Sequence, residues 1–192
     1  MQHITHKFMK VNGIQKPNIL IDLVKDNNHA GHKVAIFSNK NDTVNFVSYH
    51  LDENQIDHIK ICKDVDYQNR IGLLDDFNRG NINVLCCSDV ISRGIDTKNL
   101  HHVINYDCPR HMSDYVHRAG RTGRVGNNFC GLVTTLVHKE PEARLVQEIE
   151  MAVRTNTKLQ GINPNIKRLI TKLKHSQGAE ETPINYNMFD SQ

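Results

Sequence analysis

The sequence lacks the features that mark membrane and secreted proteins. None of its apolar runs approaches the roughly 20 residues that a membrane-spanning helix needs. Its N-terminus, MQHITHKFMK, has no apolar core like that of a signal peptide, and it is not rich in Arg and Ser like a transit peptide. We therefore expect no membrane partner, and we interpret Met1 either as a true start or as a cut inside a longer protein.

Cysteine is scarce, and its spacing does not suggest a disulfide framework or a zinc site. The number of cysteines is odd, and none of them forms a Cys-x-x-Cys pair. Most lie in apolar, strand-like runs, where cysteine acts as a small buried hydrophobe. A reducing compartment is the simplest setting, and no metal site is predicted. The cysteines are Cys62, Cys86, Cys87, Cys108 and Cys130.

The chain also lacks a strong excess of charge of either sign. Its 192 residues carry a formal net charge of +3, with 38% hydrophobic and 23% charged residues, which is ordinary for a globular domain with its own core. The mild basicity permits a nucleic-acid partner without requiring one. The 12 histidines leave open a metal-binding or pH-sensing role, and His101 with His102 and His29 with His32 are pairs that lie close in sequence.

Short apolar runs alternate with stretches of helical periodicity along most of the chain. This alternation predicts an α/β fold, with an open, mainly parallel sheet and helices on both faces. In such folds ligands bind beyond the carboxyl ends of the strands. The expected strands are Thr5–Val11, Val34–Phe37, His58–Ile61, Val84–Cys87, Val103–Tyr106 and Gly131–Val137. The expected helices are Pro17–Asn27, Thr43–Leu51, Val65–Asn78, Ser113–Arg121 and Glu140–Val153.

The composition changes toward the C-terminus, and we predict three regions. Residues 1–153 would form the α/β domain, 154–175 a basic helical extension, and 176–192 a polar, disordered tail. Within the extension, Asn163-Pro164 is typical of a helix start, and apolar residues follow at helical spacing. Two interpretations of this helix stay open: it packs on the sheet, or its basic residues contact RNA or a protein partner.

The strongest motif is the segment Tyr115–Gly126, YVHRAGRTGRVG. Arg118, Arg121 and Arg124 recur every three residues, and His117 lies four residues before Arg121. On a helix these groups would share one face, and guanidinium groups so close together need an anion or carboxylates between them. A polyphosphate fits, because guanidinium matches phosphate oxygens bidentately. The alternatives are a solvated basic face or pairing with acidic residues, for which the candidates are Asp89, Asp96 and Asp114.

A second motif, Ser88–Asp96 (SDVISRGID), directly follows the predicted strand VLCC. It therefore begins at a carboxyl strand end, where ligands bind. Gly94 allows a ligand to approach the backbone closely, and Asp96 could accept hydrogen bonds from a ribose. The alternative is that Asp89 caps a short helix and Asp96 caps a turn.

Together these segments resemble the C-terminal RecA-like domain of the DEAD-box RNA helicases. HRAGRTGR at 117–124 is similar to the family's sixth motif, and SDVISRGID at 88–96 is similar to its fifth. VINYDCP at 103–109 is similar to the strand between them, and AIFSNK at 35–40 to the fourth motif. The resemblance covers roughly Thr5 to Val153 and implies the fold of a P-loop NTPase-type helicase domain.

The resemblance implies a role for each of these motif residues. Arg121 and Arg124 would be catalytic arginine fingers, which stabilise charge on the γ-phosphate of ATP bound to a partner domain. His117 and Arg118 would couple the ATP site to the other motifs. The residues implied to bind ATP itself are Gly94 and Asp96.

The resemblance also implies an RNA-binding surface. Asn39, Arg70, Gly80 and Ser88 would lie along the RNA backbone and contact it without sequence preference. Tyr67 stands where the family usually has a glutamine, three residues before Arg70, so the contact of that glutamine is not carried over. Ser88 stands where threonine is common and keeps the hydroxyl group.

The motifs that hold ATP and Mg²⁺ in this family are missing from the sequence. It has no Gly-x-x-x-x-Gly-Lys-[Ser/Thr] phosphate loop and no Asp-Glu-Ala-Asp. ATP and Mg²⁺ would be held mainly by an N-terminal RecA-like domain, so we expect the chain to be the C-terminal half of an ATP-dependent RNA helicase and inactive alone. The alternative is a non-catalytic module that binds RNA or a partner protein.

Two further segments, at 42–58 and 143–154, are similar to a mitochondrial branch of the family that is linked to assembly of the large mitochondrial ribosomal subunit. The expected location is the mitochondrial matrix, with the nucleus or nucleolus and the cytoplasm as alternatives. The expected partners are single-stranded or locally duplex RNA, the N-terminal RecA-like domain and ribosomal assembly particles.

Overall fold

The computed structural model of the protein describes residues 4–63, 65–89, 97–124 and 128–155. These residues belong to one structural unit that spans residues 1–160, and they are the subject of the description that follows. The predicted ATP-binding residues Gly94 and Asp96 lie outside the described residues. So does nearly all of the predicted C-terminal extension and the whole of the predicted tail, so these domain boundaries stay predictions.

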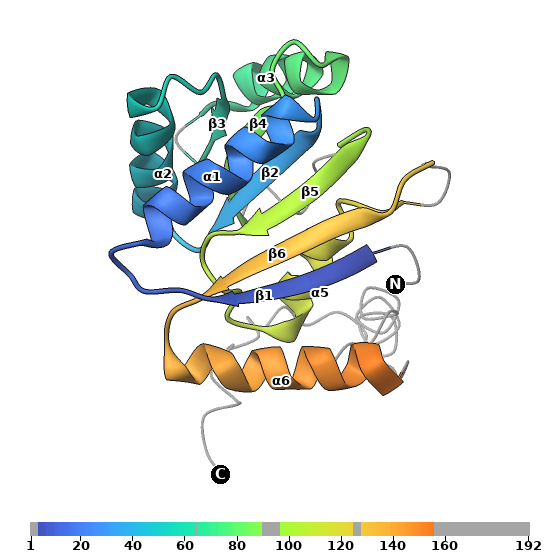
Figure 1. The fold of residues 1–192 in the computed structure, drawn as a ribbon. Helices are drawn as coiled ribbons and strands as arrows, with labels where there is room; N and C mark the ends of the chain where they lie inside the picture. Colours follow the sequence, from blue (N-terminus) through green and yellow to red (C-terminus); the bar gives the residue numbers. More distant parts are fainter. Residues whose placement is uncertain (1–3, 64, 90–96, 125–127, 156–192) are drawn as a thin grey trace, which may run out of the picture. The chain divides into compact units, whose positions relative to one another are not determined.

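The described part of the chain is built on a six-stranded sheet in the order β1-β6-β5-β2-β4-β3 (Figure 1). Every neighbouring pair of strands is parallel; for example, Ile36 is paired with Cys86 on one side and Ile104 on the other. The predicted open, parallel α/β sheet is therefore confirmed. The strands are β1 (Ile4–Lys10), β2 (Lys33–Ser38), β3 (Ile59–Ile61), β4 (Val84–Ser88), β5 (Leu100–Asn105) and β6 (Gly131–Val137).

Helices pack on both faces of this sheet, and each face has its own apolar core. The helices α1 and α2 supply one core with residues such as Leu20 and Val47. The other core contains Phe77, Tyr115 and Ile149, which come from α3, α5 and α6 respectively. Figure 1 shows α1 crossing in front of β2 and α5 lying behind the sheet. The helices are α1 (Lys16–His29), α2 (Asn41–Glu53), α3 (Tyr67–Arg79), α5 (Met112–Ala119) and α6 (Glu140–Thr155).

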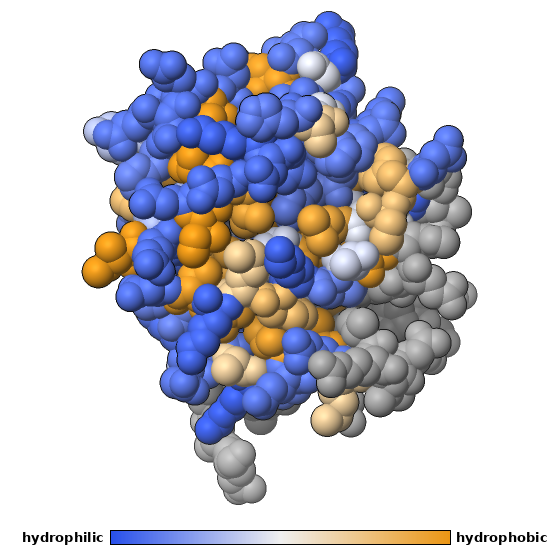
Figure 2. Space-filling view, in the orientation of Figure 1, coloured by the Kyte–Doolittle hydropathy of each residue, from blue (hydrophilic) through white to orange (hydrophobic). Residues whose placement is uncertain are grey.

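The central strand β2 is apolar at successive positions because both of its faces are covered. Val34 and Ile36 face the core under α1 and α2, whereas Ala35 and Phe37 face the opposite core. All six residues of the strand are buried, as expected for a strand covered on both sides. At the β1 edge the cover is incomplete, and Figure 2 shows apolar atoms at the surface between α1 and β1.

Most helix ends differ from the sequence expectation by one or two residues, and for two of them the structure shows what sets the end. Helix α3 begins at Tyr67 rather than Val65, because the Asp66 side chain accepts hydrogen bonds from the backbone N–H groups of Gln68 and Asn69. Helix α5 ends at Ala119, before the predicted end at Arg121, and Gly120 is its C-cap. Among the described residues, no helix combines the length and the apolar character that a membrane span would need.

Candidate functional site

The centre of the candidate site is Arg118, whose side chain is completely buried. Its Nε atom donates a hydrogen bond to Asp89 Oδ1 at 2.6 Å, and its Nη2 atom forms an ion pair with the other oxygen of the same carboxylate. Nη2 also donates to Asn39 Oδ1 at 2.6 Å. Nη1 donates to the backbone oxygen of Asp107 at 2.8 Å and to Asn105 Oδ1 at 3.3 Å. A buried guanidinium of this kind is tolerable because its charge is paired and its donors are satisfied.

The partners of Arg118 come from the carboxyl ends of three adjacent strands. Asn39 follows β2, Asp89 follows β4, and Asn105 is the last residue of β5. We call this end of the sheet the carboxyl edge, and the end where the strands begin the amino edge. Arg118 therefore joins the segments resembling the fourth, fifth and sixth motifs through one side chain.

The three arginines do not share one helical face, as they would if the helix continued through Arg124. Helix α5 stops at Ala119, so only Arg118 lies on it, and that side chain points into the protein. For Arg118 the alternative interpretation, pairing with Asp89, is what the structure shows. Arg121 and Arg124 follow in a turn that includes Gly123, which has a positive φ of 59°.

The two arginines of this turn are half-buried, and each folds back toward the preceding turn of the chain. Arg121 Nε donates to the backbone oxygen of His117 at 3.2 Å, and Arg124 Nε donates to that of Gly120 at 3.5 Å. The hydroxyl of Thr97 donates to the backbone oxygen of Arg121 at 3.4 Å. The residue that directly follows the predicted ATP-binding Asp96 therefore lies beside the turn.

The four predicted RNA-binding residues do not form one surface. The Asn39 side chain accepts from Arg118 and donates to the backbone oxygen of Cys108 at 2.9 Å, so both of its polar groups are used internally. Ser88 is buried and donates to Asn41 Oδ1 at 3.2 Å. Arg70 folds onto the loop before α3, donating to the backbone oxygens of Val65 and Lys63. Their role as RNA contacts stays a prediction.

Gly80 lies apart from the other three. It caps the C-terminus of α3 with φ 87° and precedes β4, so it lies at the amino edge. A Cβ atom on Gly80 would be 3.8 Å from Lys33 Cε, and Lys33 is the first residue of β2. The length of a strand of this sheet therefore separates Gly80 from Asn39 and Ser88.

Basic residues that the sequence interpretation missed line a cavity of about 620 Å³ at the carboxyl edge. Two acidic residues in its lining are engaged: Asp107 pairs with Lys16 at 3.4 Å, and Glu142 accepts from the backbone N–H groups of His138 and Lys139. The rule that ligands bind after strand ends would have found this group. The remaining cationic lining residues are Lys40, after β2, Arg110, after β5, and Lys139, after β6.

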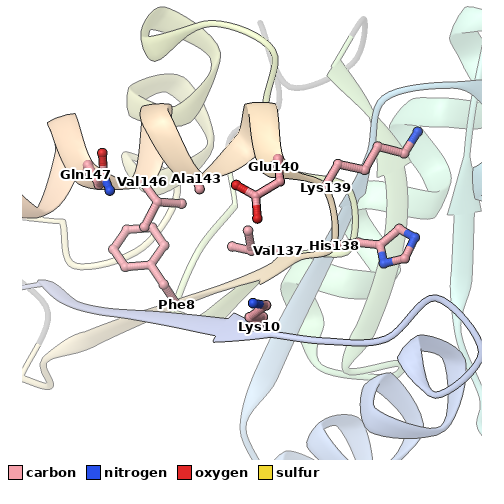
Figure 3. A pocket seen from close by; sticks show the side chains of 9 residues that line it. All are labelled: Phe8, Lys10, Val137, His138, Lys139, Glu140, Ala143, Val146 and Gln147. Atoms are coloured by element: carbon pink, nitrogen blue, oxygen red, sulfur yellow. The ribbon is translucent and has the colours of Figure 1, made fainter.

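A smaller hollow of about 330 Å³ lies between the edge strand β1 and helix α6 (Figure 3). Phe8, Val137 and Val146 form its apolar wall, and Lys10 and Glu140 lie at its rim (Figure 3). None of the residues predicted from the motifs lines this hollow. We therefore do not include it in the candidate site.

The buried thiols near Arg118 have no properties of reactive cysteines. Burial raises the pKa of Cys87 to about 12, against the opposing effect of the Arg118 charge. Burial likewise raises the pKa of Cys108 to about 12. These thiols stay protonated at neutral pH, as expected for cysteines that serve as core residues. Over the described ranges, no group of three or more His, Cys, Asp or Glu residues is placed to hold a metal ion.

A six-stranded parallel sheet with this strand order, and an arginine turn after α5, define the RecA-like class of helicase domain. The family model "Helicase conserved C-terminal domain" matches residues 15–126, which is more than half of the chain. The chain belongs to this family. Its motifs and relatives place it among the DEAD-box helicases, so the resemblance found in the sequence is confirmed.

The comparisons with individual proteins agree with this assignment. The chain is 36% identical over 171 residues to "Probable ATP-dependent RNA helicase DDX28" of Mus musculus, covering 86% of this chain and 32% of the relative. It thus spans about a third of that relative's length. A DEAD box protein from Methanococcus jannaschii matches with TM-score 0.69 and 27% identity over 82% of this chain and 41% of the other. A variant of S. cerevisiae Dbp5 bound to RNA and ADP BeF3 matches with TM-score 0.72 over 91% of this chain and 46% of the other, and its 24% identity shows the fold alone.

Proposed function

We propose that this domain works as the C-terminal half of an ATP-dependent RNA helicase, completing an ATP site on a partner RecA-like domain. The observation that carries the proposal is that the three arginines differ in burial and in position. Arg118 is buried and paired, whereas Arg121 and Arg124 lie in a turn outside the helix. Phosphoryl transfer spreads negative charge over the γ-phosphate oxygens, and a guanidinium group brought to that charge accelerates the reaction.

The other domain would hold ATP and Mg²⁺. The sequence has no phosphate loop, and the described residues provide no cluster of acidic ligands for a metal ion. Mg²⁺ held there would neutralise part of the charge of the phosphates. This chain's own contribution is then electrostatic: Arg121 and Arg124 face the γ-phosphate when the two domains close, and Gly94 and Asp96 contact the nucleoside.

RNA would bind at the carboxyl edge of the sheet. Lys40, Arg110 and Lys139 bring positive charge to the cavity there, and contacts of this type hold phosphates without reading sequence. Arg118 joins the strand ends at this edge to the helix that leads to the arginine turn. A shift of the strand ends on RNA binding would therefore move α5 and the arginine turn that follows it. This connection supports the predicted coupling role of Arg118.

The test uses a chimera in which this chain is fused behind the N-terminal RecA-like domain of the mouse relative. We expect RNA-stimulated ATP hydrolysis by the unmodified chimera. Arg124→Ala should lower its turnover about 10³-fold or more while RNA binding is kept. Arg144→Ala, which removes an exposed arginine of α6, is the matched control and should leave turnover unchanged. Unchanged turnover in the Arg124 variant would rule out its role as an arginine finger.

A non-catalytic RNA- or partner-binding module is the second candidate function. Its support is the absence of a phosphate loop from this sequence. For the isolated 192-residue chain we expect no measurable ATPase and weak, salt-sensitive RNA binding. A chimera that binds RNA yet shows no RNA-stimulated ATPase would favour this module over the helicase.

We also propose that the protein acts in the mitochondrial matrix, on ribosomal assembly particles. The support is the similarity of residues 42–58 and 143–154 to the mitochondrial branch of the family, together with the similarity to DDX28. Fractionation of cells that produce the tagged full-length protein tests the location. Recovery in the nucleus, nucleolus or cytoplasm would contradict it.

A further inference from the structure

The turn that carries Arg121 and Arg124 is fastened to the sheet by the residue between them. Thr122 is 1% exposed, although it lies in a turn between two half-buried arginines. Its hydroxyl donates to the backbone oxygen of Leu100 at 2.6 Å, and His101 O is a second acceptor at 3.2 Å. Leu100 begins β5, so this one hydroxyl group ties the turn to the amino edge of the sheet.

We call the hydrogen-bonded Thr122 side chain the anchor of the turn. Gly131, the first residue of β6, leaves the space that this side chain occupies. A Cβ atom at position 131 would lie 2.5 Å from Thr122 Oγ1, 2.6 Å from the backbone N of Gly123 and 2.9 Å from Thr122 Cγ2. No side chain fits at such distances unless the turn moves away. The backbone of β6 thus packs directly on the turn, at the point where φ of Gly123 is positive.

A second buried threonine, Thr97, also contacts the turn. Thr97 is 3% exposed, and its hydroxyl donates to the backbone oxygen of Arg121. The carbonyl group of the Arg121–Thr122 peptide is therefore held by the Thr97 hydroxyl, and the Thr122 side chain is held by its own hydroxyl. Together these contacts fix the backbone of residues 121–123, from which the half-buried side chain of Arg121 and the adjacent Arg124 extend.

We infer that Thr122 and Gly131 are positioning residues for Arg121 and Arg124. This inference rests on the proposed arginine-finger function, and it adds the reason why the arginines are effective. A guanidinium group stabilises a transition state only if it is held in place beforehand, and a misplacement of about 1 Å can cost roughly 10²-fold in rate. Arginine is a long, flexible side chain, so the precision must come from its backbone.

The first test examines the anchor in the 192-residue chain, without any ATPase. Thr122→Val keeps the shape of the side chain but removes the hydroxyl, and Thr122→Ser keeps the hydroxyl. Thr134→Val is the matched control, because Thr134 is an equally buried hydroxyl residue of β6 that bonds to His102 instead. Hydrogen exchange of the amides in residues 120–124 should be about tenfold faster in Thr122→Val only. Equal exchange rates in Thr122→Val and the wild type would contradict the claim that the Thr122 hydroxyl holds the turn.

The second test measures RNA-stimulated ATP hydrolysis in the chimera. Thr122→Val should lower kcat about tenfold or more with little change in the RNA concentration for half-maximal rate, and Thr122→Ser should restore most of it. Gly131→Ala should act in the same direction as Thr122→Val. If Thr134→Val lowers kcat as much, the effect is one of stability alone and the positioning role is wrong. If Arg121→Ala lowers kcat and Thr122→Val does not, the proposed function stands and the positioning role fails.

Discussion

His102 makes the stability of this domain depend on pH in a way that the structure specifies. The imidazole is buried, with Nε2 2.8 Å from Thr134 Oγ1. The side-chain amide of Asn27 donates to Nδ1 at 2.9 Å and also donates to Leu23 O. Nδ1 is thus an acceptor, and a proton placed on it would break that bond. Burial, aided by the charges of His32 and Lys7, lowers the pKa of His102 from 6.5 to about 4.

The sign and size of the effect follow from this shift. In the unfolded chain His102 regains its ordinary pKa, so between 6.5 and about 4 the unfolded state binds more protons than the folded state. The stability gained from a neutral His102 is therefore complete above the unfolded pKa and is lost as pH falls toward 4. Between pH of about 7.5 and about 5, the loss amounts to about 2 kcal/mol.

Urea denaturation of the wild type and of His102→Gln at these two pH values measures the effect. The variant should be less stable at neutral pH, yet its stability should fall by about 2 kcal/mol less on acidification. Thr134→Val serves as the control, because it is also destabilised but keeps a buried imidazole and hence the wild-type pH dependence. A His102→Gln protein whose stability falls as steeply as that of the wild type would refute the reasoning.

Two further predictions concern the buried arginine and the thiols. Arg118→Ala should lower the free energy of unfolding by about 3–5 kcal/mol, because Asp89 loses its ion pair and two strand ends lose hydrogen bonds; a loss under about 1 kcal/mol in urea denaturation would contradict this. Titration of the native protein with a thiol reagent should show one fast-reacting group, Cys130, because the other four cysteines are buried; a wild-type fast phase in Cys130→Ser would contradict this.

The fold was predictable because each of its elements is specified locally. The runs VAIF and VLCC are apolar on both sides, as only strands covered on both faces are, and both became central strands. Helical stretches alternate with these strands, and this alternation predicts a parallel sheet. The helix ends were less predictable, because they depend on single side chains such as Asp66, which caps α3.

The sequence indicated Arg118 and some of its partners, but it did not indicate the geometry of the candidate site or the basic residues of the cavity. A spacing of three residues places arginines on one face only while the helix continues, and α5 ends at Ala119. Gly120 and Gly123 were the available signal, since glycine after the last periodic residue commonly ends a helix. Asn39 is used internally by partners that lie 69 and 79 residues away in the sequence, and no local pattern reports such contacts.

Helix α5 is held near its C-terminal end by two buried polar groups, and this bears on how the domain would respond to ATP. Near its C-terminal end, Arg118 reaches back to the carboxyl edge of the sheet, and Thr122 fastens the following turn to the amino edge. The helix itself has eight residues, which makes it about 12 Å long. A helix so short, whose C-terminal end is bonded to both edges of the sheet, has little freedom to tilt on it. We therefore expect the arginine turn to approach a nucleotide by movement of the whole domain, with the anchor of the turn unchanged.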